Sequence, residues 1–309
     1  MNSLIVPADK SSRMFPVVSK PVVIPAAGKG SRMLPITAIV PKEGTFVLTK
    51  INGHYRNDFL VNHVLNSCID CGLLDVVIIA GYQKGSLQDI VCMVGPEETR
   101  DAEFVVQNQS FGWGLGKAIE AAEKAVKHYA GDDFVVWLGD NIFDNTDSIK
   151  DMIYSADDYF AKILVLKTDR PSFYGVVKFD SDFNGSNGLI TDIFEKPDVN
   201  EREPYAVDGF YYGVAGVYVF SKKIFDYLKR IKPGKDGEFQ LTDAIKLGID
   251  CGERVCCYVH DGERYDFGTW VDYNNYQARF WSEVYKNPVL LDKLNEDQMS
   301  LMLKLKGGF

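Results

Sequence analysis

A short apolar stretch, residues 22–25, runs into a loop that carries two glycines and an arginine. Because Gly28 and Gly30 lack side chains, the backbone of this loop can approach phosphate oxygens closely and turn its N–H groups toward them. Arg32 follows in the same loop and supplies a positive charge. Lys42, in the sequence Pro-Lys-Glu, offers a second cation. This combination predicts a site for the phosphates of a nucleoside triphosphate.

The spacing of the glycines distinguishes this loop from two other known types of phosphate-binding loop. Residues 28–32, Gly-Lys-Gly-Ser-Arg, fit neither the dinucleotide pattern G-x-G-x-x-G nor the P-loop pattern G-x-x-x-x-G-K-[ST]. Hydride transfer and P-loop hydrolysis are therefore disfavoured. Two glycines also occur at strand-to-helix turns of α/β domains that have no phosphate site, and for the loop alone this alternative stays open.

Two aspartates are candidates for holding a metal ion. Asp140 follows a predicted strand at 134–138, and ligands of open α/β folds bind at this end of the strands. Mg²⁺ prefers one or two carboxylates together with phosphate oxygens and water. Asp266, between another predicted strand and a tight turn, can supply the second carboxylate, although a turn aspartate or a helix N-cap would read the same way.

Polar residues at two further strand ends could hold a base and a second anion. Gln107 ends a predicted strand at 104–106, and its amide offers the donor and acceptor that match the imide edge of uracil or thymine. Gly114 would let the base pack closely. Glu195 and Lys196 end another strand and bring a further cation. Each of these residues could also be an ordinary loop or solvated surface residue.

Composition narrows the class of protein. The 309 residues carry a formal charge of −9, which argues against a non-specific nucleic-acid binder. The sequence has no run of about 18 apolar residues and no secretion signal, so we expect no membrane contact and a cytoplasmic location. Cys68 and Cys71 form a single C-x-x-C pair, which we interpret as small buried side chains of a helix.

Strand-like and helix-like runs alternate through the first half of the chain, which predicts crossover connections and a largely parallel sheet. Expected strands lie at 22–25, 76–80, 104–106, 134–138, 163–166, 175–179, 189–194, 214–220 and 255–260, and expected helices at 59–71, 115–129, 222–230 and 241–250, with a helical tail after 273.

Taken in order, these motifs resemble the sugar-1-phosphate nucleotidyltransferases, most closely the bacterial UTP:glucose-1-phosphate uridylyltransferases. The resemblance spans about residues 22–273. It rests on the glycine loop with Pro-Lys-Glu at 26–43, Gln107 with Gly114-Leu115, Gly-Asp-Asn at 139–141, Tyr-Gly-Val-Val at 174–177, Glu-Lys-Pro at 195–197, Val-Ala-Gly-Val-Tyr at 214–218, Glu-Phe-Gln-Leu-Thr-Asp-Ala-Ile at 238–245 and Asp-Phe-Gly at 266–268.

The resemblance implies one three-layer α/β/α fold of the nucleotide-diphospho-sugar transferase type around a mixed, mostly parallel sheet. With the resemblance spanning about 22–273, we expect an N-terminal extension at 1–20, a nucleotidyltransferase domain at 21–272 and a C-terminal helical segment at 273–309. Its implied site residues are Arg32 and Lys42 for catalysis, Ala26, Ala27, Gly28, Gln107, Gly114 and Asp140 for the nucleotide, Gly175, Glu195, Lys196 and Val214 for the sugar phosphate, and Asp140 and Asp266 for Mg²⁺.

The implied reaction joins a nucleoside triphosphate to glucose-1-phosphate. The sugar-phosphate oxygen attacks the α-phosphorus in line and pyrophosphate leaves. A phosphate monoester is already an anionic nucleophile, so no deprotonating base is required, and the protein positions the substrates and neutralises charge.

Several alternatives stay open. The Gly-Asp-Asn and Asp-Phe-Gly-Thr motifs also resemble thymidylyltransferases, so dTTP competes with UTP as the nucleotide. A regulator that binds sugar nucleotides without turnover is disfavoured by Lys42 and Arg32, and a glycosyltransferase by the absence of a D-x-D motif after Asp140. Residues 44–57 form a longer insertion than the family normally has beside Lys42. Apolar residues after 280 suggest either a homo-oligomer contact or packing on the chain's own domain.

Overall fold

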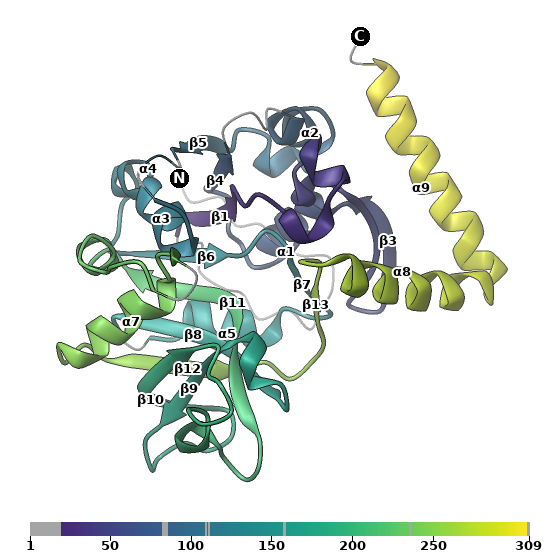
Figure 1. The fold of residues 1–309 in the computed structure, drawn as a ribbon. Coiled ribbons are helices and arrows are strands. Elements are labelled where there is room, and N and C mark those ends of the chain that lie inside the picture. The colour runs from purple at the N-terminus through teal and green to yellow at the C-terminus, as the bar shows by residue number, and fades with distance from the viewer. Residues whose placement is uncertain are drawn as a thin grey trace.

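The computed structural model describes residues 20–81, 86–108, 110, 112–156, 159–234 and 237–307, so nearly all of the predicted extension 1–20 lies outside the described residues. A nine-stranded sheet forms the centre of the molecule (Figure 1). Its strands, in spatial order, are β5 (Glu103–Gln107), β4 (Val76–Gly81), β1 (Val22–Ala26), β6 (Asp133–Trp137), β11 (Tyr211–Ser221), β8 (Ala161–Thr168), β12 (Val255–Val259), β10 (Asn187–Glu195) and β9 (Gly175–Phe179).

The directions of the strands make this a mixed sheet. β5, β4, β1 and β6 are parallel neighbours, as the predicted crossovers require. β11 runs antiparallel to β6 and β8, whereas β8 and β12 are parallel, and β10 is antiparallel to β12 and β9. The predicted α/β class and mixed sheet are confirmed.

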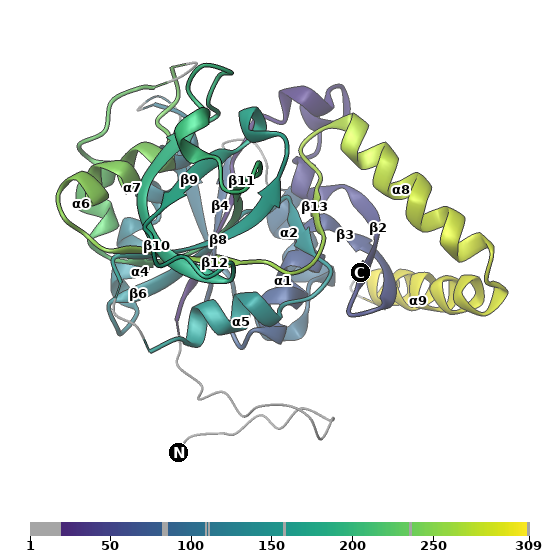
Figure 2. The ribbon, with the colours of Figure 1, turned by 90° about the horizontal axis from the view of Figure 1, so that it is seen from below.

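Alternate residues along the strands enter two separate hydrophobic cores, because side chains of a strand point to opposite faces. Val22 and Ile24 belong to one core and Val23 to the other. Helices cover both faces (Figure 2). The first core is covered by α1 (Leu60–Asp70), α2 (Ser86–Val94), α5 (Asp147–Tyr154) and α8 (Trp270–Tyr285), and the second by α3 (Leu115–Ala121), α4 (Glu123–His128), α6 (Ile224–Leu228) and α7 (Leu241–Asp250).

The helix expected over 115–129 is divided in the structure. α3 and α4 are separated at Ala122, whose N–H bonds to the carbonyl of Ile119 at 3.0 Å. This i to i−3 hydrogen bond tightens the chain into a 3₁₀-type turn between the two helices. The apolar face survives the break, since Ile119, Ala122 and Val126 are all fully buried.

The insertion at 44–57 is an ordered hairpin rather than a loop. β2 (Phe46–Ile51) pairs antiparallel with β3 (His54–Phe59). Asn52 and Gly53 connect them with φ values of 49° and 78°, the positive values that a two-residue I′ turn requires. Gln277 of α8 holds the hairpin, since its amide accepts from Leu48 N at 2.9 Å and donates to Leu48 O at 3.0 Å.

The C-terminal helical segment begins three residues earlier than expected, at Trp270 instead of 273. α8 starts at Trp270, capped by the Thr269 hydroxyl, which accepts from Asp272 N at 3.1 Å, so the predicted boundary between 272 and 273 falls inside a helix. Phe280 is fully buried, and Trp281, Leu290 and Leu291 pack partly buried against the same core. Packing on the chain's own domain therefore accounts for these residues. α9 (Pro288–Gly307) follows α8 after a sharp change of direction (Figure 1) and contacts β3 and α2.

Among the described residues, none of the helices combines the length and the hydropathy that crossing a bilayer would need.

Candidate functional site

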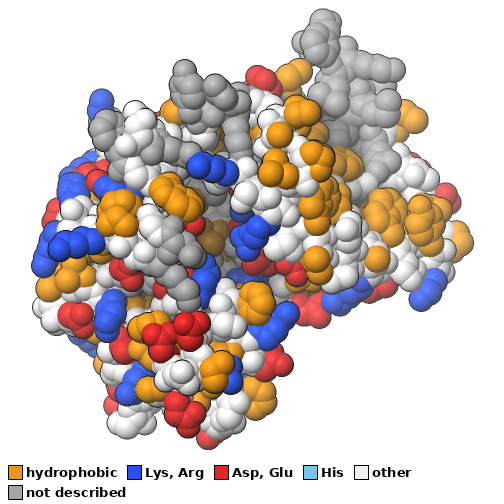
Figure 3. All heavy atoms as spheres, in the orientation of Figure 1, with side chains coloured by type: hydrophobic (Ala, Val, Ile, Leu, Met, Phe, Trp, Pro, Cys, Tyr) orange, Lys and Arg blue, Asp and Glu red, His pale blue; other side chains and the backbone are white. Residues whose placement is uncertain are grey.

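A cavity of about 560 Å³ lies beyond the carboxyl end of β1. Figure 3 shows a hollow on this face of the molecule with Lys and Arg side chains around it. The cavity brings together most of the predicted site residues, namely Ala27, Gly28, Arg32, Lys42, Gln107, Gly114, Asp140, Glu195 and Lys196.

The glycine loop has the open backbone that its sequence predicts. A Cβ added at Gly28 would meet nothing within 4 Å, so this face of the loop is open to the cavity. Gly30 has a φ of 64°, and its carbonyl accepts from Met33 N at 2.8 Å and from the Thr37 hydroxyl at 2.7 Å. These bonds fix the turn into the 3₁₀-helix η1 (Ser31–Met33) that presents Arg32.

Lys42 and Asp140 form an ion pair inside the cavity. The Lys42 ammonium donates to Asp140 Oδ2 and lies 3.8 Å from Glu43 Oε1, whose side chain is 1% exposed. Burial alone would lower the pKa of Lys42, but the charges of Asp140 and Glu43 raise it above its usual range. Burial would likewise raise the pKa of Asp140, yet Lys42 lowers it. Both groups are therefore charged at neutral pH.

The second oxygen of Asp140 is also held. Asn141 Nδ2 donates to Asp140 Oδ1 at 2.9 Å, and the backbone carbonyl of the buried Asn141 accepts from Trp137 Nε1 at 3.1 Å. Asp140 thus stands just after β6 with both carboxylate oxygens oriented, one by an amide and one by Lys42.

A small second sheet brings Asp266 beside Asp140. β13 (Arg264–Asp266) pairs antiparallel with β7 (Asn141–Phe143), with Asp266 opposite Asn141, and Phe267 N donates to Asp140 O at 3.0 Å. Burial, and next the charge of Asp140, raise the pKa of Asp266, while Arg264 opposes the rise. Two carboxylates that repel each other in a cavity form a place that favours a cation.

The donor set fits Mg²⁺ shared with a phosphate. A Cβ added at Gly268 would lie 2.8 Å from Asp266 Oδ1, 3.5 Å from Arg32 Nη2 and 3.7 Å from Asp140 Oδ2, so both carboxylates and the guanidinium surround one small space. Within the described ranges, no group of three or more His, Cys, Asp or Glu side chains could hold a metal alone. Mg²⁺ needs only one or two carboxylates when substrate phosphates complete its shell.

A substitution that fills the space beside Gly268 tests whether a metal ion or a phosphate binds there. We expect Gly268→Ala to lower kcat by about 10- to 100-fold, because a methyl group there displaces Asp266 and small misplacements carry penalties of this size. The half-saturating Mg²⁺ concentration should rise as well. Rates measured against Mg²⁺ concentration, with the melting temperature as a folding check, decide the point. A folded variant with wild-type Mg²⁺ dependence would show that nothing binds in this space.

The predicted sugar-phosphate residues lie together around Glu195. Gly175 is its partner in the β9–β10 register, and a Cβ at Gly175 would come within 2.8 Å of Thr242 Cγ2 and 3.2 Å of Glu195 Oε2. The Thr242 hydroxyl donates to Glu195 Oε2 at 3.0 Å, and Lys196 Nζ lies 3.2 Å from Oε1. Val214 is buried, with its side chain 3.5 Å from the same Cβ position.

The predicted base site contains the buried amide of Gln107. Gln107 is 4% exposed, and in the described part of the chain its Nε2 has no hydrogen-bond acceptor. Gly114 is required for a reason that the sequence does not reveal. Its φ is 107°, and a Cβ there would lie 2.7 Å from both N and O of Phe239, so the glycine lets another chain segment cross it. Contact of Gly114 with a base remains a prediction.

Four predicted residues do not line this cavity, and others that do line it were missed. Gly175 and Val214 lie beside Glu195 without being among the lining residues, and Asp266 lines an adjoining cavity. Ala26 packs into the core and is not among the residues that line the cavity. Lys29, Trp113, Glu238 and Gln240 do line it. Glu238 and Gln240 belong to the Glu-Phe-Gln-Leu-Thr-Asp motif, which was the available signal for them.

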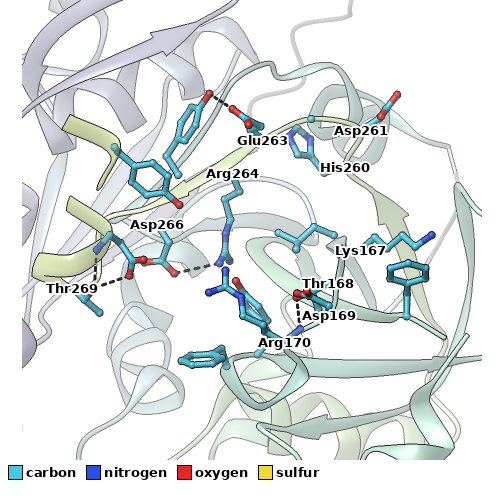
Figure 4. Close-up of a pocket in the computed structure, with 18 of the residues that line it drawn as sticks. Lys167, Thr168, Asp169, Arg170, His260, Asp261, Glu263, Arg264, Asp266 and Thr269 are labelled. Atoms are coloured by element: carbon cyan, nitrogen blue, oxygen red, sulfur yellow. Dashed lines mark hydrogen bonds and ion pairs between the residues drawn. The ribbon is translucent and has the colours of Figure 1, made fainter. Parts of the chain in front are cut away.

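A second cavity of about 730 Å³ adjoins the first, and Arg32 lines both. Figure 4 shows Arg264 pointing into this second cavity with its guanidinium turned toward Asp266. Arg264 Nη2 lies 3.3 Å from Asp266 Oδ2, its side chain is only 6% exposed, and the guanidinium lies 4.9 Å from the centre of the Tyr174 ring. Arg264 therefore forms an ion pair with Asp266 and helps to keep this carboxylate charged.

Comparisons with known proteins agree with these motifs. The family described as nucleotidyl transferase matches residues 21–282. A UTP–glucose-1-phosphate uridylyltransferase 1 of Staphylococcus saprophyticus is 28% identical over 279 residues, covering 82% of this chain and 90% of that one. A UDP-glucose pyrophosphorylase solved with UDP-glucose is 25% identical, with a TM-score of 0.71, covering 86% of this chain and all of that one. A putative glucose-1-phosphate thymidylyltransferase of Bacillus anthracis is 27% identical, with a TM-score of 0.66, covering 85% and 95%.

Proposed function

Because the chain belongs to the nucleotidyl transferase family, we propose that it transfers a nucleotidyl group from a nucleoside triphosphate, UTP in the first place, to glucose-1-phosphate, releasing pyrophosphate. One observation carries the proposal. Four charged side chains from separate segments, Arg32, Lys42, Asp140 and Asp266, lie close together where two adjoining cavities meet. The first cavity is lined by Arg32, Lys42 and Asp140, and its other walls hold the buried Gln107 amide and the Glu195 cluster, whereas Asp266 lines the second. The names of the relatives support UTP and glucose-1-phosphate as the substrates.

The reaction requires charge neutralisation rather than proton transfer. An oxygen of the sugar phosphate forms a bond to the α-phosphorus, and the bond from that phosphorus to the bridging oxygen of pyrophosphate breaks. Backbone N–H groups near Gly28, together with Arg32 and Lys42, stabilise the charge on the phosphates. Asp140 and Asp266 would hold Mg²⁺, which supplies further neutralisation when bound. Lys196 and Glu195 orient the sugar phosphate.

Lys42 has two alternative partners in this scheme. Without substrate its ammonium is bound by Asp140 and Glu43. A bound triphosphate offers it phosphate oxygens instead, and moving to them frees Asp140 Oδ2 as a metal ligand. The ammonium stays protonated throughout, because its pKa is raised in the free protein.

The buried amide of Gln107 supplies a test of the base site. We expect Gln107→Leu to raise the KM for the nucleotide by about 10- to 100-fold. The polar edge of the base gives up its hydrogen bonds to water on binding, and leucine offers no hydrogen bond in return. Discrimination between uracil or thymine and the other bases should shrink with it. Initial rates with each triphosphate measure both effects. Unchanged KM values and unchanged base preference would place the base elsewhere.

The experiment for the function is pyrophosphate release with Mg²⁺, glucose-1-phosphate and each of UTP, dTTP, CTP, ATP and GTP. A preference for UTP supports the proposal as stated. A preference for dTTP, as the Bacillus anthracis relative's name suggests, keeps the chemistry and changes the nucleotide. No release with any triphosphate, despite binding of UDP-glucose, would replace the proposal by a non-catalytic binding role.

A further inference from the structure

We propose that the indole ring of Trp113 forms one wall of the nucleobase pocket and stacks on the base. This inference rests on the proposed function and adds to it a further residue that contacts the base. The ring lines the same cavity as Gln107 and is 43% exposed, although it is one of the largest apolar side chains of the protein. An aromatic face left open inside a cavity is the kind of surface on which bases stack.

The backbone around Trp113 is held in place by the segment that contains Phe239. Trp113 O accepts from Phe239 N at 2.9 Å. The flanking Gly112 and Gly114 have φ values of 116° and 107°, and a Cβ at either would come within 2.8 Å of Phe239 atoms. Two glycines in unusual backbone conformations therefore hold the tryptophan on the rim of the cavity.

The neighbouring surfaces match the remaining sides of a pyrimidine. Leu115 and Ala118 of α3 give the cavity an apolar floor, and Ala118 is 5% exposed. Gln107 adds a buried amide whose donor has no acceptor within the described segments. A flat ring with a polar edge is the ligand shape that one aromatic wall, an apolar floor and one amide would accept.

Lys29 links this wall to the phosphate loop. Its ammonium lies 5.6 Å from the centre of the Trp113 ring, a cation–π contact across the cavity between the glycine loop and the segment before α3. A triphosphate is a stronger partner for an ammonium than an aromatic face. We therefore expect Lys29 to move to the phosphates when a nucleotide binds and to leave the indole face for the base.

This arrangement predicts that substitutions of Trp113 and of Lys29 weaken the binding of different ligands. Trp113→Ala should weaken binding of uridine and of UTP by a similar factor, about 10-fold or more, while binding of inorganic pyrophosphate stays unchanged. Lys29→Met should weaken UTP and pyrophosphate and leave uridine unchanged or tighter. Trp113→Phe, which keeps an aromatic face, should recover most of the affinity.

The test is calorimetric titration of these variants with uridine, UTP and pyrophosphate, together with quenching of tryptophan fluorescence by UTP. Trp281→Phe is the matched control, because Trp281 lies on α8 and packs against Tyr285. Quenching should persist in the control and disappear in Trp113→Phe. The inference would be overturned if Trp113→Ala bound uridine and UTP as tightly as the wild type does, or if it lost binding of pyrophosphate. In either case, turnover by the wild type would leave the proposed function intact. Absence of turnover and of UTP binding in the wild type would overturn both.

Discussion

Replacing Lys42 by alanine is expected to slow nucleotidyl transfer by about 3 to 4 kcal/mol of barrier, or two to three powers of ten in kcat. The reason is the position of the ammonium, which is charged, largely buried and bound by Asp140 on the side of the cavity where phosphates would lie. Once the ammonium contacts the phosphates, its charge stabilises the transition state, and the alanine variant loses this stabilisation.

The same variant should bind Mg²⁺ more tightly in the absence of nucleotide, because Asp140 Oδ2 no longer has the ammonium as a competing partner. Lys150→Ala is the matched control: Lys150 is 18% exposed against 16% for Lys42 and is paired with Asp70 at 2.9 Å, away from the cavity. Single-turnover rates and Mg²⁺ titrations of the three proteins give the answer. Wild-type kcat in Lys42→Ala would remove this lysine from the chemistry.

Replacing Asp140 by asparagine should have an effect of similar size, about 4 kcal/mol, because a metal-binding carboxylate contributes several kcal/mol of charge stabilisation. The asparagine keeps the shape of the side chain and an acceptor for Asn141, so the backbone at the end of β6 has no reason to move. The pKa of Lys42 should fall at the same time, since Asp140 is the strongest of the groups that raise it.

Asp192→Asn controls for the loss of a carboxylate paired with a lysine, because Asp192 accepts from Lys246 at 2.5 Å and from Tyr205 at 2.7 Å outside the cavity. Activity measured over a wide range of Mg²⁺ concentrations should be low throughout for Asp140→Asn and normal for Asp192→Asn. Recovery of full activity at high Mg²⁺ would mean that Asp140 sets affinity for the metal and has no further role.

Local patterns in the sequence predicted the parallel half of the fold well. Each of the strands β1, β4 and β6 is a short run of mostly apolar residues with a glycine at its end or shortly after it, and a few consecutive residues are enough to recognise this pattern. Parallel strands that are buried on both faces typically have such continuous apolar sequences. The hairpin at 46–59 could have been predicted too. Asn52-Gly53 between strand-like segments is the dipeptide that I′ turns favour, and its signal was overlooked.

The site depends on contacts between distant segments, which spacing alone does not reveal. Asp140 and Asp266 are neighbours because β7 and β13 pair, and two strands of three residues each leave almost no periodic signal. From the sequence, Gly114 is predicted to make room for a ligand, whereas the structure shows that it makes room for Phe239. Trp113 has no sequence signal beyond its flanking glycines, because its importance lies in its exposure within the cavity.

The most direct test of the account follows the oxygen atoms of the sugar phosphate. Glucose-1-phosphate carrying ¹⁸O at its non-bridging phosphate oxygens is incubated with UTP, Mg²⁺ and the protein, and the products are analysed by ³¹P NMR and mass spectrometry. Attack of the sugar phosphate on the α-phosphorus places one ¹⁸O between the two phosphorus atoms of UDP-glucose and leaves the pyrophosphate unlabelled. Appearance of ¹⁸O in pyrophosphate, or UTP consumption without a labelled sugar nucleotide, would contradict nucleotidyl transfer as the activity of this site.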